Sequence, residues 1–160
     1  MKRHLFIFVL LAGVQASAAA GPAFPEYLTG TWATAESLFA GTEAQAELHL
    51  AADGFGIMGG STPAPIRLDG VKDDKPAPRG IVGFPLQAEM DGLRIKLQIL
   101  MPQGERLKPV PQLVVACTYK PDPATLSCLP PQGKPIVMQR RSISLEPEAV
   151  RQIEQLRQAL

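Results

Sequence analysis

Apolar and polar side chains alternate along much of this chain with a two-residue period, which is typical of strands that bury one face. The period is clearest at residues 44–50 and 93–99, where every second residue is apolar. A glycine in a turn sequence adjoins each segment, Gly54 after the first and Gly92 before the second. Because glycine adopts the positive φ of tight turns, we expect a hairpin at both places.

Shorter segments rich in strand-forming residues lie around these two. They cover residues 28–34, 55–57, 66–68, 81–88, 113–120 and 136–144. The stretch from 69 to 79 is charged, contains Pro76 and Pro78, and is expected to be an exposed loop. The spacing of the segments predicts a mainly β fold, an antiparallel meander of about seven or eight strands that forms a small barrel or a curved sheet.

The end of the chain changes to a helical period. Its apolar residues, three or four positions apart, are Ala149, Ile153, Leu156 and Leu160. This stripe predicts one amphipathic helix over about 147–160 that covers the sheet. Ser144 or Glu146 is expected to cap its start, and Pro147 suits a first turn. With this helix, residues 21–160 are expected to form a single β-rich domain.

The first twenty residues have the features of a secretory signal peptide. A positively charged start precedes an apolar run over residues 5–14, and two A-x-A cleavage motifs end at Ala18 and Ala20. The run is shorter than the roughly 20 apolar residues that span a bilayer. We therefore expect residues 1–20 to be removed and the mature protein to reach the bacterial periplasm or the medium, with no membrane span.

Composition narrows the function classes. The 160 residues carry 16 Lys and Arg against 15 Asp and Glu, a net charge of +1, and the basic residues form no run. A nucleic-acid-binding protein needs a basic surface to neutralise phosphates, so nucleic acid is not an expected partner. The 16 prolines and 14 glycines are scattered and exclude an all-helical fold.

Cys117 and Cys128 are the two cysteines of the chain. The segment between them contains Pro121 and Pro123, which are expected to turn the chain between neighbouring strands. In an oxidising compartment this arrangement favours a disulfide, which a loop-entropy argument values at about 3 kcal/mol. A redox pair usually has the tighter C-x-x-C spacing, and a zinc site would need more soft ligands than these thiols and His49. We expect a structural disulfide.

A glycine motif resembles a cofactor site. Gly54, Gly56 and Gly59 spell the dinucleotide-binding pattern G-x-G-x-x-G. That pattern holds a pyrophosphate only where its last glycine opens a helix, and Pro63 and Pro65 prevent a helix here. We expect a glycine-rich return strand and no cofactor.

Other titratable residues do not assemble into a recognisable site. Glu47 and His49 share the polar face of one strand, but two ligands do not hold a metal, and no serine lies in a G-x-S-x-G elbow. Asp69, Asp73 and Asp74 do not match the spacing of a calcium loop. No catalytic, cofactor-binding or metal-binding residue is therefore assigned.

The first expected strand resembles that of lipocalin-like small β-barrel proteins. Gly30 and Trp32 match the G-x-W of that family, and a strand meander and a C-terminal helix follow. In the family the tryptophan closes the barrel bottom and an arginine of the last strand packs over it. The resemblance implies a buried Trp32 with Arg140 or Arg141, which alternate on the last strand, against its ring. It also implies a small apolar ligand in the barrel mouth.

These observations favour an exported, non-enzymatic binding or accessory protein. Two modes stay open: a small apolar ligand held inside a barrel, or another envelope protein bound on an exposed sheet face, with Trp32 as an exposed anchor. An enzyme with an unfamiliar site is a third alternative. A cavity lined with Leu, Ile and Met would indicate a ligand carrier, whereas a filled interior with an exposed apolar patch would indicate a protein partner.

Overall fold

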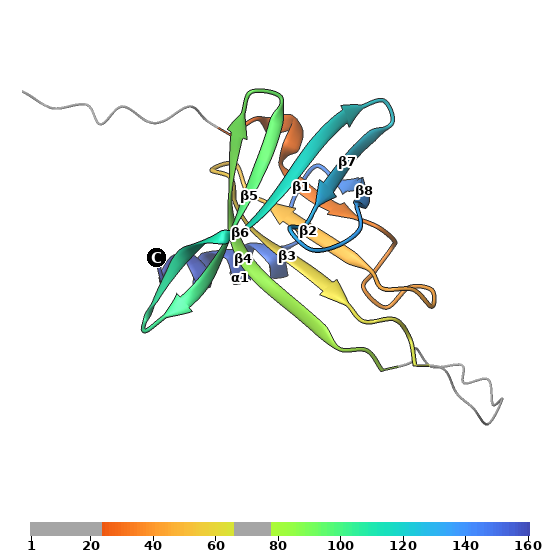
Figure 1. Cartoon of the computed structure of the whole chain (residues 1–160), viewed down its shortest axis with the longest axis horizontal. Helices are drawn as coiled ribbons and strands as arrows, with labels where there is room; N and C mark the ends of the chain where they lie inside the picture. The colour runs from red at the N-terminus through yellow and green to blue at the C-terminus, as the bar shows by residue number, and fades with distance from the viewer. Residues whose placement is uncertain (1–23, 66–77) are drawn as a thin grey trace, which may run out of the picture.

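The chain forms a β-barrel in a computed structural model that describes residues 24–65 and 78–160 (Figure 1). The expected signal peptide at 1–20, the short strand at 66–68 and all but the end of the charged loop, with its three aspartates, lie outside the described residues. No helix in the described part is long and apolar enough to cross a membrane.

Eight antiparallel strands make up the barrel, each hydrogen-bonded to its neighbours in sequence order, and the first strand pairs with the last. The strands are β1 (Gly30–Ala33), β2 (Ala46–Leu50), β3 (Phe55–Ser61), β4 (Ile81–Asp91), β5 (Arg94–Gln103), β6 (Arg106–Pro121), β7 (Ala124–Leu129) and β8 (Ile136–Ser142). A 3-10 turn, η1 (Glu26–Leu28), precedes β1, and helix α1 (Pro147–Arg157) follows β8. The predicted β meander is confirmed, and it closes into a barrel rather than a curved sheet.

The two-residue period decides which side chains enter the barrel. On β2, Ala46, Leu48 and Leu50 are buried, while Glu47 and His49 between them lie on the outer face and are half buried. The same alternation on the other strands fills one end of the barrel with large apolar side chains. Gly56 and Gly59 of the glycine motif lie on β3, and Gly54 lies in the turn before it, so the motif does not open a helix.

Leu93 does not belong to the buried face that its spacing predicts. It lies in the tight turn between β4 and β5, where its exposed fraction is 91%. The turn needs a positive φ at Gly92, so the strand begins one residue later, at Arg94. Ile95, Leu97 and Ile99 are buried as predicted.

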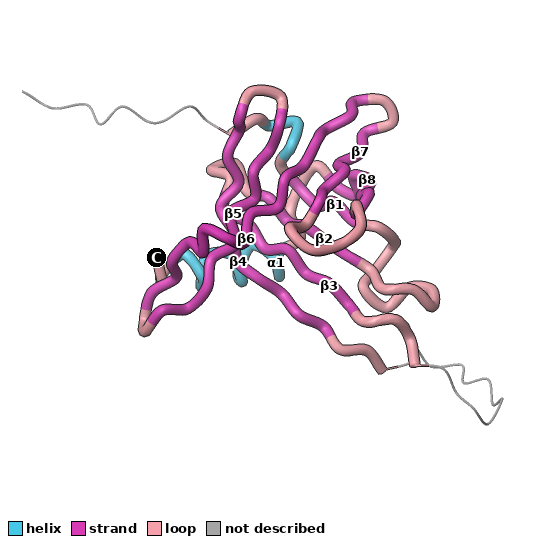
Figure 2. Tube along the Cα trace, in the orientation of Figure 1, coloured by secondary structure: helices cyan, strands magenta, loops and turns pink. Residues whose placement is uncertain are grey.

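The hairpin of β5 and β6 is much longer than the sequence predicts. Beyond a register shift between Gln98 and Leu100, the two strands continue to Gln103 and back from Arg106. The sequence predicts no strand over this outer part, residues 100–112, where several prolines interrupt the apolar period. Figure 2 shows that it bends away from the barrel and lies beside α1.

Helix α1 is the only α-helix among residues 24–65 and 78–160, as predicted, and it ends at Arg157 rather than 160. Ile153 is buried against Phe55 of β3 and against Leu100 and Leu107 of the long hairpin. The Leu107 amide donates a hydrogen bond to the Ala159 carbonyl, with 2.6 Å between the nitrogen and oxygen. The helix therefore covers the outer face of the barrel, held between the barrel and the hairpin.

Two details of the predicted helix are wrong. Glu146 occupies the N-cap position, but its side chain makes no capping hydrogen bond, and Ser144 pairs with Ser142 instead. Leu160 lies beyond the helix end and is 52% exposed, so it does not continue the buried stripe.

Candidate functional site

The two ends of the barrel differ in how they are filled. One end holds an apolar cavity of about 600 Å³, and we call it the open end. The cavity is lined by residues of β2 to β6 and β8 and of the adjoining loops: Thr34, Ala44, Gln45, Ala46, Met58, Gly59, Gly60, Ser61, Thr62, Gly80, Val82, Phe84, Ile99, Leu113, Val115, Pro130 and Ile136. Val82 and Phe84 are 55% and 37% exposed, so the cavity reaches solvent.

A layer of buried side chains closes the cavity on its inner side, and we call it the floor layer. On six strands, the floor residue lies two positions from a lining residue, because side chains alternate along each strand. The floor layer consists of Trp32, Leu48, Leu86, Leu97, Cys117 and Met138, all essentially inaccessible to solvent.

Small residues on one side of the barrel create the cavity. On the ladder between β2 and β3, Ala46 lies opposite Gly60, and Gly60 in turn lies opposite Val82 on β4. A Cβ atom added to Gly60 would meet nothing nearer than the Gln45 carbonyl oxygen, at 3.7 Å. The space beside Gly60 is therefore open, and a larger side chain there would enter the cavity.

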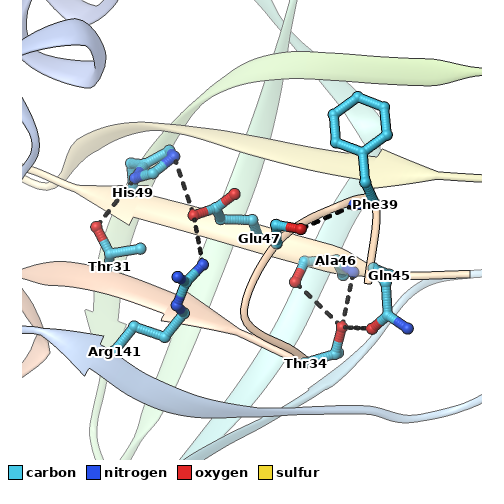
Figure 3. Close-up of polar contacts among 9 residues, drawn as sticks. Thr31, Thr34, Phe39, Gln45, Ala46, Glu47, His49 and Arg141 are labelled. Carbon is cyan, nitrogen blue, oxygen red and sulfur yellow. Dashed lines mark hydrogen bonds and ion pairs between the residues drawn. The ribbon is translucent and has the colours of Figure 1, made fainter. Parts of the chain in front are cut away.

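No lining residue of the cavity, among the residues that the structure describes, carries an ionisable side chain. The polar lining residues are held by bonds within the protein. Thr34 Oγ1 lies 2.7 Å from Gln45 Oε1, and the Ala46 amide donates to the same hydroxyl oxygen (Figure 3). The Ser61 hydroxyl accepts a hydrogen bond from the Gln45 amide. The arrangement therefore presents an uncharged, mostly hydrocarbon surface.

The opposite end, which we call the closed end, is sealed by Trp32. This side chain is fully buried, and its indole Nε1 donates a 2.8 Å hydrogen bond to the Leu28 carbonyl of η1. The Arg140 guanidinium carbon lies 4.7 Å from the indole ring centre, and Tyr119 meets the same ring edge-on. Trp32 is thus not the exposed anchor of the alternative hypothesis. Gly30, with a positive φ of 103°, lies close to the end of β8, and a side chain there would collide with the Ser142 carbonyl oxygen.

Of the two candidate arginines, Arg140 is the one placed on Trp32. Its Nε and Nη2 atoms are buried and have no hydrogen-bond partner in the described part of the chain, and the guanidinium makes a cation–π contact with the ring face. Arg141 points to the outer face of the barrel, where it lies 3.5 Å from a Glu47 carboxylate oxygen.

The outer face of β1, β2 and β8 carries a polar cluster of Thr31, Glu47, His49 and Arg141 (Figure 3). The His49 Nδ1 atom lies 3.1 Å from Thr31 Oγ1, and its Nε2 atom lies 3.8 Å from Glu47 Oε1. Burial lowers the pKa of His49 below its ordinary value, although the carboxylates of Glu47 and Glu146 act to raise it and Arg141 acts to lower it further. The imidazole is therefore neutral at neutral pH.

The polar cluster has the order of a nucleophile, a base and an orienting acid, but it lacks access. Thr31 is 3% exposed, so its hydroxyl cannot reach a substrate without a rearrangement. Glu47 pairs with Arg141, which competes with a metal for the carboxylate. No group of three or more potential metal ligands lies together in the described residues. The cluster therefore links the three strands β1, β2 and β8 through side-chain contacts.

Cys117 and Cys128 form the predicted disulfide. They lie directly opposite each other on β6 and β7, and both are buried in the barrel core. The disulfide thus joins the floor layer to β7, far from solvent.

The sequence prediction assigned no function to the residues that line the cavity. The adjacent glycines Gly59 and Gly60, on a strand beside one that starts with small alanines, are the sequence signal that could have indicated it.

A scan against models of protein families finds no match for this chain, and searches of the curated proteins and of the solved structures find none either.

Proposed function

We propose that this protein is an exported, non-enzymatic carrier that holds a small apolar ligand in the open end of its barrel. The observation that carries the proposal is the cavity of about 600 Å³ with its charge-free lining. Ligand-binding cavities have volumes of roughly 300–1,000 Å³ and are lined mainly by apolar side chains. A barrel whose only role was structural would gain stability from filling this space.

The resemblance to lipocalin-like proteins supports the same proposal. The closed barrel, the C-terminal helix and the contact of Arg140 with Trp32 agree with what the resemblance implies. An exported location is expected from residues 1–20, and the disulfide fits an oxidising compartment.

Titration with N-phenyl-1-naphthylamine, a neutral dye that fluoresces in apolar surroundings, tests the proposal. We expect saturable binding to the wild-type protein at one site. Gly60→Leu should weaken binding at least about ten-fold, equivalent to about 1.4 kcal/mol, because the new side chain occupies the cavity. Its unfolding free energy should not fall, since the added Cβ has room.

Gly83→Leu is the matched control. Gly83 lies on β4 opposite Gly59, and an added Cβ atom would have Ile57 Cγ2 at 3.8 Å as its nearest neighbour. It lies outside the set of residues that line the cavity. This variant should bind the dye like the wild type. Absence of saturable binding to the wild type, or equal binding by Gly60→Leu, would contradict the proposed function.

A further inference from the structure

The charge distribution around the cavity restricts the ligand further than its size does. We propose that the carrier selects an uncharged ligand, an alkyl or acyl chain ending in an alcohol or an ester, over the ionised acid of the same length. This inference rests on the proposed function and names the chemical class that the same site takes.

The lining gives an anionic group no cationic partner, because it contains no lysine, arginine or histidine among the described residues. The Thr34 hydroxyl and the Gln45 side-chain amide donate to protein groups. The Ser61 and Thr62 hydroxyls, which accept bonds from backbone amides, are the two lining donors without an acceptor in the described part of the chain. Moving a carboxylate from water into such surroundings is unfavourable unless a cation or several hydrogen-bond donors receive it. An alcohol or an ester loses much less hydration on the same transfer.

Two arginines of the described residues, Arg140 and Arg79, are turned to other groups. Arg140 faces the interior but lies on Trp32, and Trp32 belongs to the buried floor layer that separates it from the cavity. Arg79 borders the open end, outside the lining. Its guanidinium donates hydrogen bonds to the carbonyl oxygens of Gly41 and Glu43 in the loop before β2.

The rim extends the apolar surface outward, which strengthens the discrimination. Val82, Phe84 and Leu113 line the cavity and are also substantially exposed, so hydrocarbon continues from the interior to the edge of the barrel. A chain bound inside has its polar end beside these side chains. An ionised end would lose part of its hydration there, whereas an ester end would gain apolar contacts.

Competition with the bound dye tests the inference, using methyl laurate, 1-dodecanol and laurate at about pH 8, where a carboxylic acid is ionised. The ester and the alcohol should displace the dye with inhibition constants at least about ten-fold lower than that of laurate. As the pH falls toward about 4, laurate should approach the ester because it becomes neutral. The ester, measured in parallel at each pH, reports any change in the protein itself.

A charge placed in the lining should reverse the preference. Ile136→Arg puts a guanidinium into the cavity wall, and laurate should then compete at least about ten-fold better relative to the ester than it does in the wild type. Val137→Arg is the matched control, because Val137 is the next residue of β8, faces outward and is 56% exposed. It should keep the wild-type preference.

The outcomes separate this inference from the proposed function. If the dye binds and laurate at about pH 8 competes as well as methyl laurate, the inference is overturned while the carrier function stands. If the dye binds and none of the three chains displaces it, the chain class is wrong. If no dye binds, both proposals fail. Should Ile136→Arg not fold, as judged by circular dichroism, the wild-type pH series alone decides.

Discussion

Trp32 joins four separate elements, three of them through its side chain. Its indole donates to η1, its face receives Arg140 of β8, and its edge meets Tyr119 of β6, while its backbone pairs with Leu48 of β2. A residue with so many partners is fixed in one orientation, and the closed end of the barrel is built around it. Arg140 would also be left without its aromatic partner if the ring were removed.

Replacing Trp32 should therefore destabilise the fold strongly. Trp32→Ala is expected to lower the unfolding free energy by about 3–5 kcal/mol through the cavity it leaves. Trp32→Phe keeps most of the packing and loses mainly the indole hydrogen bond, with an expected cost nearer 0.5–1.5 kcal/mol on that account. Urea denaturation measures both. Wild-type emission should be blue-shifted, and a red-shifted, freely quenched spectrum would contradict the burial.

His49 should make stability depend on pH. Burial lowers its pKa in the folded protein, so the unfolded chain binds a proton more readily than the folded one. Its contribution is fully present above the unfolded pKa of about 6.5 and is lost as the pH falls through the lowered folded pKa. Denaturation at a series of pH values should show this decline for the wild type and a smaller one for His49→Gln. Identical curves would exclude a role for His49.

At the scale of elements, the long β5–β6 hairpin and α1 stabilise each other. Leu100 and Leu107 of the hairpin pack with Ile153 of the helix, and all three share one apolar cluster with Phe55 of the barrel. The pair forms a second, smaller core outside the barrel. This second core has to stay folded for the part of β3 around Phe55 to remain covered.

Ile153→Ala should cost about 2–5 kcal/mol, since Ile153 is, like Phe55, fully buried in this second core. Leu160→Ala is the control on the same C-terminal segment, and its effect should stay within about 0.5 kcal/mol because Leu160 is half exposed. Thermal or urea unfolding distinguishes the two. Equal effects would mean that the helix does not pack as described. Removing α1 altogether should promote aggregation by exposing Phe55.

The disulfide is a second stabilising link between elements. Replacing both Cys117 and Cys128 by Ser should lower the unfolding free energy by about 2–5 kcal/mol, with dye binding retained under conditions where the variant is folded. Alkylation of the wild type without reductant should modify neither residue. Loss of binding without loss of stability would contradict a purely structural role.

Elements whose period is uninterrupted were predictable from the sequence. The strand ending at Leu50 and the one from Ile95 to Ile99 bury the residues that their spacing selects, because a slip of one residue would turn all of them to solvent. The outer part of the long hairpin was not predictable. Pro102 and Pro109 obscure its period, and its buried residues Leu100 and Leu107 pack with Ile153 of α1, which is distant in the sequence.

For the whole molecule, the barrel is a filled half and a hollow half. The filled half could be anticipated, since large alternating residues have to be buried somewhere. The cavity could not be anticipated, because several strands contribute to it. Ala46, Gly60 and Val82 leave space only where strand pairing in the barrel brings them together. Small residues far apart in a sequence give no sign of where they meet.

The pairing of β1 with β8 determines when, during synthesis, the barrel can close. The barrel closes only after Ser142 has been synthesised, because Thr31 of β1 pairs with Ser142 of β8. Until then the growing molecule is an open sheet with two unpaired edges, able to template strands from other molecules. A chain halted before β8 would therefore be aggregation-prone however well its earlier strands had paired.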